Sequence, residues 1–286
     1  MTAPNMGKVG IWSMELRFGD QVEGAEAASE LDELGYGAIW VTGGIDDQVL
    51  GDVDRLLDAT SRTTIATGII NVWKQTPEDV AAWFKAESPD RQNRTMLGIG
   101  ISHSPIIGAD WGKPVGKMRE YCDGLDAGGV PRENVCIAAL GPKMVELSGE
   151  RTAGTHPYLV TPEHSAICRE IMGPGKLVAP EQGVVLSTDP EIARGAARKA
   201  LAFYRGLPNY RNSWKRLGFS EDEIEAMSDR FIDGIFAWGT PETIAERVKA
   251  HHDAGADHVC LQVIQTTEGG IPGARAAWRE LAGALL

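Results

Sequence analysis

Residues 28–41, ASELDELGYGAIWV, place a helical pattern, a glycine and a buried strand in direct succession. Gly35 ends the helical pattern, where a left-handed backbone is easiest for a residue without a Cβ. Residues 248–263, VKAHHDAGADHVCLQV, repeat this order with Gly255 at the turn. One copy stands near each end of the chain, which predicts a closed series of strand–helix units.

Eight short runs rich in Val and Ile alternate with amphipathic stretches. Continuous hydrophobicity is typical of strands buried on both faces, in a parallel sheet covered by helices. The runs are residues 8–14, 37–42, 63–73, 95–102, 134–140, 156–161, 182–187 and 257–264. In a chain of 286 residues they predict an α/β fold, a (β/α)8 TIM barrel, as a single domain over 1–286. Residues 206–238 are longer than one strand–helix unit requires, and they are predicted to form a helical insertion before strand 8.

Helix starts are marked where several of these runs end. Thr76, Thr161, Asp189 and Thr240 each precede a proline and then an acidic residue. A capping side chain, a proline in the first turn and an early acid are the usual signals of a helix N-terminus.

The composition restricts the location and the partners of the protein. A net charge of −12 argues against nucleic acid and against an anionic membrane surface as partners. The N-terminal residues lack the pattern of a signal peptide, and no apolar run approaches the ~20 residues of a membrane span. Cys122, Cys136, Cys168 and Cys260 are widely spaced and are interpreted as reduced core residues. We therefore expect a cytoplasmic protein with a small-molecule substrate.

In a barrel of this kind the loops after the strands build the active site. Few ionisable residues follow the predicted strands, and the six histidines show no metal-binding spacing, so no metal site is expected. Residues 194–216 carry seven Lys or Arg and no acid. They are either a solvated helix face or an electropositive wall for an anionic ligand. Helix starts at Gly141-Pro142-Lys143 and Thr161-Pro162 offer backbone N–H groups to a phosphate.

Several motifs together resemble the bacterial luciferase-like superfamily, and within it the actinobacterial oxidoreductases that use the deazaflavin coenzyme F420. The resemblance covers nearly the whole chain. It is carried by residues 30–41 (ELDELGYGAIWV), 63–73 (TTIATGIINVW), 97–103 (LGIGISH), 154–164 (GTHPYLVTPEH), 179–190 (APEQGVVLSTDP), 207–219 (LPNYRNSWKRLGF), 238–248 (WGTPETIAERV) and 255–263 (GADHVCLQV).

The resemblance implies the barrel fold and a deazaflavin ring over the carboxyl ends of the strands. It implies a cis peptide at Gly68-Ile69 that backs the ring. The cofactor-binding positions that it implies are Thr42, Gly43, Gly68, Ile69, Asn71, Ser102, Gly141, Pro142, Lys143, Thr161 and His164. His164 is equally compatible with a purely structural role in its helix.

The resemblance also bears on the chemistry. In the sugar-phosphate dehydrogenase branch a His and a Glu perform the acid–base step, and the matching positions here are Gly44 and His103. This departure argues against sugar-phosphate oxidation and leaves His103 as the candidate catalytic proton donor. Side chains near the strand ends are expected to line a fairly apolar substrate pocket: Trp12, Trp73, Trp111, Tyr210 and Arg211.

The resulting hypothesis is an oxidoreductase that transfers a hydride between F420 and a small organic substrate. Two alternatives stay open: an FMN-dependent luciferase-like monooxygenase, and a non-catalytic F420-binding protein. Relatives often form homodimers, which makes a homodimer an expectation here as well.

Overall fold

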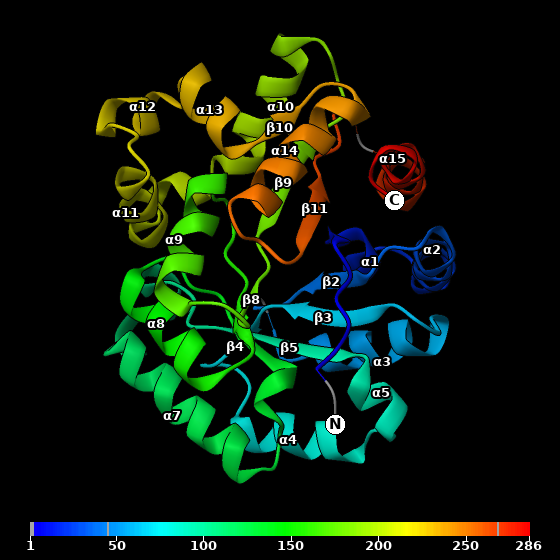
Figure 1. Ribbon diagram of the computed structural model, residues 1–286, viewed down its shortest axis with the longest axis vertical. Helices are drawn as coiled ribbons and strands as arrows, with labels where there is room; N and C mark the ends of the chain where they lie inside the picture. The colour runs from blue at the N-terminus through cyan, green and yellow to red at the C-terminus, as the bar shows by residue number, and fades with distance from the viewer. Residues whose placement is uncertain (1–2, 45, 268) are drawn as a thin grey trace.

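The computed structural model describes residues 3–44, 46–267 and 269–286. Its strands are all parallel and form one continuous sheet with eight positions around a barrel (Figure 1). They are β1 (Val9–Ser13), β2 (Ala38–Thr42), β3 (Thr64–Gly68), β4 (Ile70–Asn71), β5 (Thr95–Gly100), β6 (Val135–Ile137), β7 (Gly154–Thr155), β8 (Leu177–Val178), β9 (Glu181–Val185), β10 (Ala237–Trp238) and β11 (Val259–Val263).

The ladder closes through one bent segment. β8 pairs with β7, and three residues further along the chain β9 pairs with β11, which in turn pairs with β1. Between these two strands the Ala179 N–H donates to the Thr155 carbonyl oxygen, and the Cys260 N–H donates to that of Pro180. β8 and β9 therefore occupy one barrel position, as β3 and β4 do, and β10 pairs with the end of β9. The predicted TIM-barrel fold is confirmed.

The helices of the described residues vary widely in length. They are α1 (Glu15–Phe18), α2 (Gln21–Leu34), α3 (Val49–Ala59), α4 (Pro77–Ala86), α5 (Pro89–Asn93), α6 (Ser104–Ile107), α7 (Pro114–Ala127), α8 (Pro142–Arg151), α9 (Pro162–Met172), α10 (Pro190–Leu201), α11 (Pro208–Arg216), α12 (Glu221–Ala226), α13 (Asp229–Ile235), α14 (Pro241–Asp253) and α15 (Gly270–Leu285), with short 3₁₀ turns η1 (Gly108–Asp110), η2 (Arg132–Asn134) and η3 (Tyr204–Gly206).

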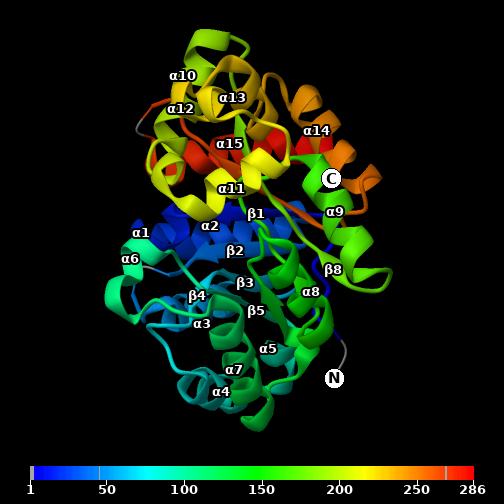
Figure 2. The ribbon, with the colours of Figure 1, turned by 90° about the vertical axis from the view of Figure 1, so that its left-hand side faces the viewer.

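An outer layer of helices covers the strands. α4, α7, α8, α9 and α14 contact one another in that order, α15 contacts both α14 and α2, and α2 contacts α3. Helices α10, α12 and α13 gather at one end of the molecule and α4 and α7 at the other (Figures 1 and 2). The segment predicted as an insertion holds α11, α12 and α13. No helix among the described residues is long and apolar enough to cross a bilayer.

The helix-ending glycines and most of the predicted helix caps are observed in the structure. Gly35 and Gly255 both take left-handed backbones, with φ of 98° and 100°. The side chains of Thr76, Asp189 and Thr240 cap α4, α10 and α14 by accepting backbone N–H bonds, whereas Thr161 caps α9 without such a bond.

The sixth strand is shorter and earlier than predicted. β7 spans Gly154–Thr155, whereas the hydrophobic run covers residues 156–161. Pro157 has no N–H for the ladder. Leu159 takes a positive φ of 56°, which is incompatible with an extended strand. The apolar residues after β7 are therefore buried as a loop, and the periodicity of the run alone did not reveal this.

Neutral histidines pack inside the barrel. The His156 ring stacks on Trp40 with centroids 3.9 Å apart, and the Trp40 indole N–H donates to His258 Nε2 over 3.1 Å. His258 Nδ1 lies 3.1 Å from the Gly7 carbonyl oxygen and His156 Nδ1 lies 2.8 Å from that of Ala179. Burial lowers the pKa of both rings to about 4, so both are neutral at pH 7.

The buried histidines predict an acid-sensitive fold. The unfolded rings bind protons near pH 6.5 and the folded rings only near pH 4, so the free energy of unfolding falls as the pH drops through this window. Urea unfolding at pH 7, 6, 5 and 4 measures this slope. His258→Gln keeps an acceptor for Trp40 without a titrating ring, and we expect a lower midpoint at pH 7 but a shallower slope. An equally steep slope in this variant would contradict the assignment.

Candidate active site

The loops after β1, β2 and β3 meet tightly at the carboxyl end of the barrel. A Cβ on Gly43 would lie 2.1 Å from the Ile69 carbonyl oxygen, and a Cβ on Gly68 would lie 2.4 Å from Trp12 Nε1. Asn71 Nδ2 donates to the Gly44 carbonyl oxygen over 3.2 Å. The structure therefore brings these predicted residues together, and neither Gly43 nor Gly68 leaves room for a side chain.

The peptide bond between Gly68 and Ile69 is cis, at the position that the family resemblance implied. Both residues are partly exposed, whereas the strand before them is buried. Trp12 Nε1 is buried and has no partner in the described part of the chain. An unpaired indole N–H beside Gly68 is a free donor for an acceptor atom of a bound molecule.

His103 follows β5 and stands at the N-cap of α6. Its ring lies 5.2 Å from that of Tyr210, and Asn209 Nδ2 lies 3.4 Å from His103 Nδ1 and 3.4 Å from the Ser102 carbonyl oxygen. Ser102 takes a positive φ of 62°. Asn209 thus occupies Nδ1 and leaves Nε2 of the ring for another partner.

The pKa of His103 differs from that of an exposed histidine. Burial lowers its pKa to about 4, so the ring is neutral at pH 7. A proton can still pass from the imidazolium form, but that form is scarce at neutral pH. A catalytic role of His103 stays a prediction.

Aromatic side chains connect Trp12 to His103 across the rim. Tyr158 lies 5.5 Å from Trp12, 5.4 Å from Tyr204 and 6.3 Å from Tyr210 between ring centroids. The Tyr158 hydroxyl donates to Gln262 Oε1 over 2.7 Å. Sequence reasoning assigned no site role to Tyr158 or Gln262, although their places after β7 and at the end of β11 were available as signals.

A buried acid lies beneath this aromatic group, and sequence reasoning missed it too. Glu181 is fully buried at the start of β9, and its Oε2 accepts the Leu159 N–H over 3.1 Å. Burial raises the pKa of Glu181 to about 8, so its carboxyl is mainly protonated at pH 7. Glu181 is therefore part of the neutral interior and adds little charge to the rim. Nothing in the hydrophobic pattern of residues 182–187 indicated an inward-facing acid.

The start of α8 forms a separate cationic subsite. Gly141 caps this helix without a side chain, and a Cβ there would meet open space. The Arg216 guanidinium donates to the neighbouring Leu140 carbonyl oxygen over 3.0 Å. Lys143 is exposed in the first turn of α8, after Pro142. A helix N-terminus beside an arginine suits a phosphate or another anion.

His164 and Thr161 stand behind this subsite, at the start of α9. The His164 ring is buried, and its Nε2 lies 3.4 Å from the Ala139 carbonyl oxygen. Burial, reinforced by the charge of Arg216, lowers its pKa to about 4. These contacts give His164 a structural part in holding the loop after β6. Direct contact of Thr161 and His164 with a cofactor stays a prediction.

The basic stretch 194–216 is largely neutralised by neighbouring acids. Its ion pairs are Arg194 with Asp229 and Asp233, Arg198 with Asp229, Arg205 with Glu225, Arg211 with Glu221 and Glu225, and Lys215 with Glu221. An electropositive wall is therefore the wrong interpretation for these five residues. The contacts of Arg211 with α12 also speak against its predicted place in a substrate pocket, whereas Arg216 lies at the anion subsite.

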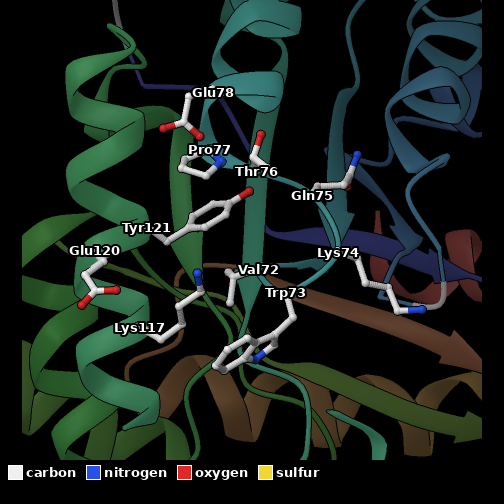
Figure 3. Close-up of a pocket in the computed structure, with 10 residues that line it drawn as sticks. All are labelled: Val72, Trp73, Lys74, Gln75, Thr76, Pro77, Glu78, Lys117, Glu120 and Tyr121. Carbon is white, nitrogen blue, oxygen red and sulfur yellow. The ribbon is translucent and has the colours of Figure 1, made fainter. Parts of the chain in front are cut away.

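Trp73 and Trp111 lie to one side of the rim. The Trp73 indole N–H donates to the Ile101 carbonyl oxygen over 2.8 Å, and its ring centroid is 6.2 Å from that of Trp111. Trp73 borders a groove between the loop after β4 and α7 (Figure 3). Among the described residues no group of three or more His, Cys, Asp or Glu side chains is arranged to hold a metal ion.

The chain belongs to the luciferase-like monooxygenase family, whose sequence model matches residues 18–258. A curated relative is the 5,10-methylenetetrahydromethanopterin reductase of Archaeoglobus fulgidus, which is 23% identical over 80% of this chain and 85% of its own length.

Solved structures share the fold at low sequence identity. An F420-dependent secondary alcohol dehydrogenase, in complex with an F420-acetone adduct, superposes with a TM-score of 0.72 and 14% identity over 99% of both chains. The oxygenating constituent of the 3,6-diketocamphane monooxygenase of Pseudomonas putida, in complex with FMN, gives a TM-score of 0.64 and 14% identity over 100% of this chain and 99% of its own. The predicted membership of the luciferase-like superfamily is confirmed.

The contact of Gly43 with Ile69 predicts a strong effect of one added methyl group. In Gly43→Ala the new Cβ collides with the Ile69 carbonyl, and overpacking of this kind lowers the free energy of unfolding by about 1–3 kcal/mol. Gly141→Ala is the matched control, because its Cβ meets open space. Urea unfolding of both variants measures the difference. Equal stability of the two variants would show that the loops after β2 and β3 do not meet this closely.

Proposed function

We propose that this protein is an oxidoreductase that transfers a hydride between coenzyme F420 and a small organic substrate. The observation that carries the proposal combines two features of the rim. The N-terminus of α8 has no side-chain cap and lies beside Arg216, and His103 is neutral at pH 7. Such a site is suited to hold an anionic cofactor tail and to orient a substrate, with little provision for hydrolysis. The F420-dependent enzyme among the structural neighbours supports the choice of cofactor.

The described residues fit the cofactor at two places. Trp12 Nε1 is a buried donor without a partner and lies beside Gly68, where the ring is expected. Gly141 and Lys143 would hold the phosphate at the start of α8 together with Arg216, which contacts the preceding Leu140 carbonyl oxygen. Thr42, Gly43, Ile69, Asn71 and Ser102 would form the surface under and beside the ring.

Coenzyme F420, when bound, supplies or accepts the hydride. The task of the protein is then to orient the substrate and to exchange one proton with it. His103 Nε2 is the proposed site of that exchange, and Asn209 positions the ring through Nδ1. Tyr210 packs against His103, Tyr158 packs against Trp12, and these rings would border the bound substrate. Their aromatic surface favours a fairly apolar substrate.

An FMN-dependent monooxygenase is the second candidate, favoured by the FMN complex among the structural neighbours. The phosphate of FMN would suit the same α8 subsite. A non-catalytic carrier of F420 is the third hypothesis, and turnover of reduced F420 with enones, imines or ketones would exclude it. A homodimer and a cytoplasmic location stay predictions.

Cofactor titration tests the proposal directly. We expect the purified protein to bind F420 in the micromolar range or tighter and to bind FMN at least tenfold more weakly, as followed by cofactor fluorescence. Tight FMN binding without F420 binding would overturn the choice of cofactor.

Arg216→Met tests the anion subsite in the same titration. Loss of one charge-assisted contact, worth roughly 1.5–3 kcal/mol, weakens binding by about 10-fold or more. Arg230→Met is the matched control, because Arg230 pairs with Glu223 on the surface of the α12–α13 region. Equal F420 affinity of the two variants would remove Arg216 from the subsite.

The low pKa of His103 predicts the pH dependence of turnover. As the proton donor in substrate reduction, the ring becomes more active as the pH falls from 7 toward its pKa of about 4, and in oxidation it stays active above pH 5. His103→Gln lowers turnover by about 100-fold and abolishes the pH slope of reduction. Steady-state rates at pH 5 to 8, with F420 affinity as a control, measure both effects. An unchanged slope in the variant would exclude His103 as the proton donor.

A further inference from the structure

A groove of about 370 Å³ lies beside the rim, outside the site described above. We call it the side groove; its lining consists of residues 72–78, which lead from β4 into α4, and of Lys117, Glu120 and Tyr121 on α7 (Figure 3). The proposed function uses neither α7 nor the residues after Trp73. The side groove therefore needs a separate explanation.

Two residues that line the side groove each have a buried polar atom without a partner in the described part of the chain. Tyr121 is 1% exposed, and its hydroxyl makes no hydrogen bond there. Gln75 is 7% exposed, and its Oε1 is likewise unpaired. The Gln75 Nε2 donates to the Asp47 carbonyl oxygen over 3.0 Å, which fixes the orientation of the amide. Unpaired buried polar groups are destabilising, and a ligand that pairs with them recovers that energy.

The charges around these atoms define what a ligand must offer. Lys117 Nζ lies 5.3 Å from the ring centroid of Trp73, and no ion pair with Lys117 occurs among the described residues. Burial raises the pKa of the Tyr121 hydroxyl, which therefore stays protonated and can donate. Lys117 and Tyr121 thus suit an anionic acceptor. Gln75 Oε1 and the Glu78 carboxylate at the same wall suit a donor.

We propose that the side groove binds a small carboxylate that carries an amino or hydroxyl group on the neighbouring carbon. The carboxylate pairs with Lys117 and the Tyr121 hydroxyl, and the amino or hydroxyl group donates to Gln75 Oε1. An apolar side chain of the ligand packs on Val72, Trp73 and Pro77. These contacts satisfy both unpaired atoms at once.

The side groove is connected to the rim through Trp73. The backbone N–H of Trp73 donates to Asn71 Oδ1 over 3.0 Å, and its indole N–H donates to the Ile101 carbonyl oxygen over 2.8 Å. Ile101 directly precedes Ser102 and His103 in the chain. A ligand that packs on Trp73 therefore contacts a residue that is hydrogen-bonded to Asn71 in β4 and to Ile101 in the loop after β5.

Four matched compounds test the binding chemistry: L-leucine, its 2-hydroxy analogue, 4-methylpentanoate and 3-methylbutylamine. The first two carry both groups, the third lacks the donor and the fourth lacks the carboxylate. Ligand-observed NMR with the full chain, free of cofactor, should detect L-leucine, the hydroxy acid or both at millimolar concentration. The other two compounds should bind at least fivefold more weakly. A preference between the first two would identify the donor as amino or hydroxyl.

Variants of the side groove locate the binding. Lys117→Met keeps the aliphatic contact with Trp73 and should weaken binding about 10-fold, with Lys249→Met, on the surface of α14, as the matched control. Tyr121→Phe should weaken it about fivefold while leaving the urea midpoint no lower, because the lost hydroxyl has no protein partner.

Absence of binding by all four compounds up to 20 mM would overturn the proposal, as would equal binding of all four. A Kd of 20 mM corresponds to a binding free energy of about −2.3 kcal/mol. Unchanged affinity in Lys117→Met and Tyr121→Phe would overturn it as well. F420 affinity should be the same in these variants and the parent, so failure here is distinguishable from failure of the proposed cofactor.

Discussion

The fold depends on the hydrogen bonding of one bent segment, residues 177–185. Its first part pairs with β7, its second part pairs with β11, and the change of partner occurs at Ala179 and Pro180. Without this change the sheet would have two free edges, and exposed strand edges are prone to mispairing. The segment joins both ladders, and because all strands are parallel their carboxyl ends lie at one rim.

The barrel interior explains why that rim can be rigid. Trp40, His156 and His258 fill the centre with stacked rings and with hydrogen bonds to the carbonyls of Gly7 and Ala179. The bond that His258 Nε2 accepts from Trp40 requires a neutral imidazole, and burial keeps both histidine rings neutral at pH 7. Glu181 and His103 are also mainly neutral at pH 7, so the candidate active site lies over groups that carry little charge. Arg216 and the start of α8 would supply the positive charge that the proposed anionic ligand needs.

The family resemblance pointed to Gly43 and Gly68, and their close loop contacts are found in the structure, whereas their part in cofactor binding stays a prediction. Gly43 and Gly68 sit where loops touch, and a position without a side chain is visible in the sequence itself. The meeting of Tyr158, Tyr204, Tyr210 and Gln262 was not visible, because these residues come from distant segments whose contact depends on barrel closure and on the placement of α11. The basic stretch illustrates the opposite error. Its charges stand out along the chain, yet acids of α12 and α13 form ion pairs with five of its seven basic residues.

The sequence by itself determined the parallel barrel, the glycine-ended helices and the helix caps, since each depends on the conformational preference of a few neighbouring residues. It also carried the family membership, because the motifs are local. Tertiary structure alone decided which side chains share an environment: the low pKa of His103, the raised pKa of Glu181, the pairing of Arg211 with α12 and the side groove between α4 and α7. Burial and charge pairing are properties of three-dimensional neighbours, and the linear order of residues does not contain them.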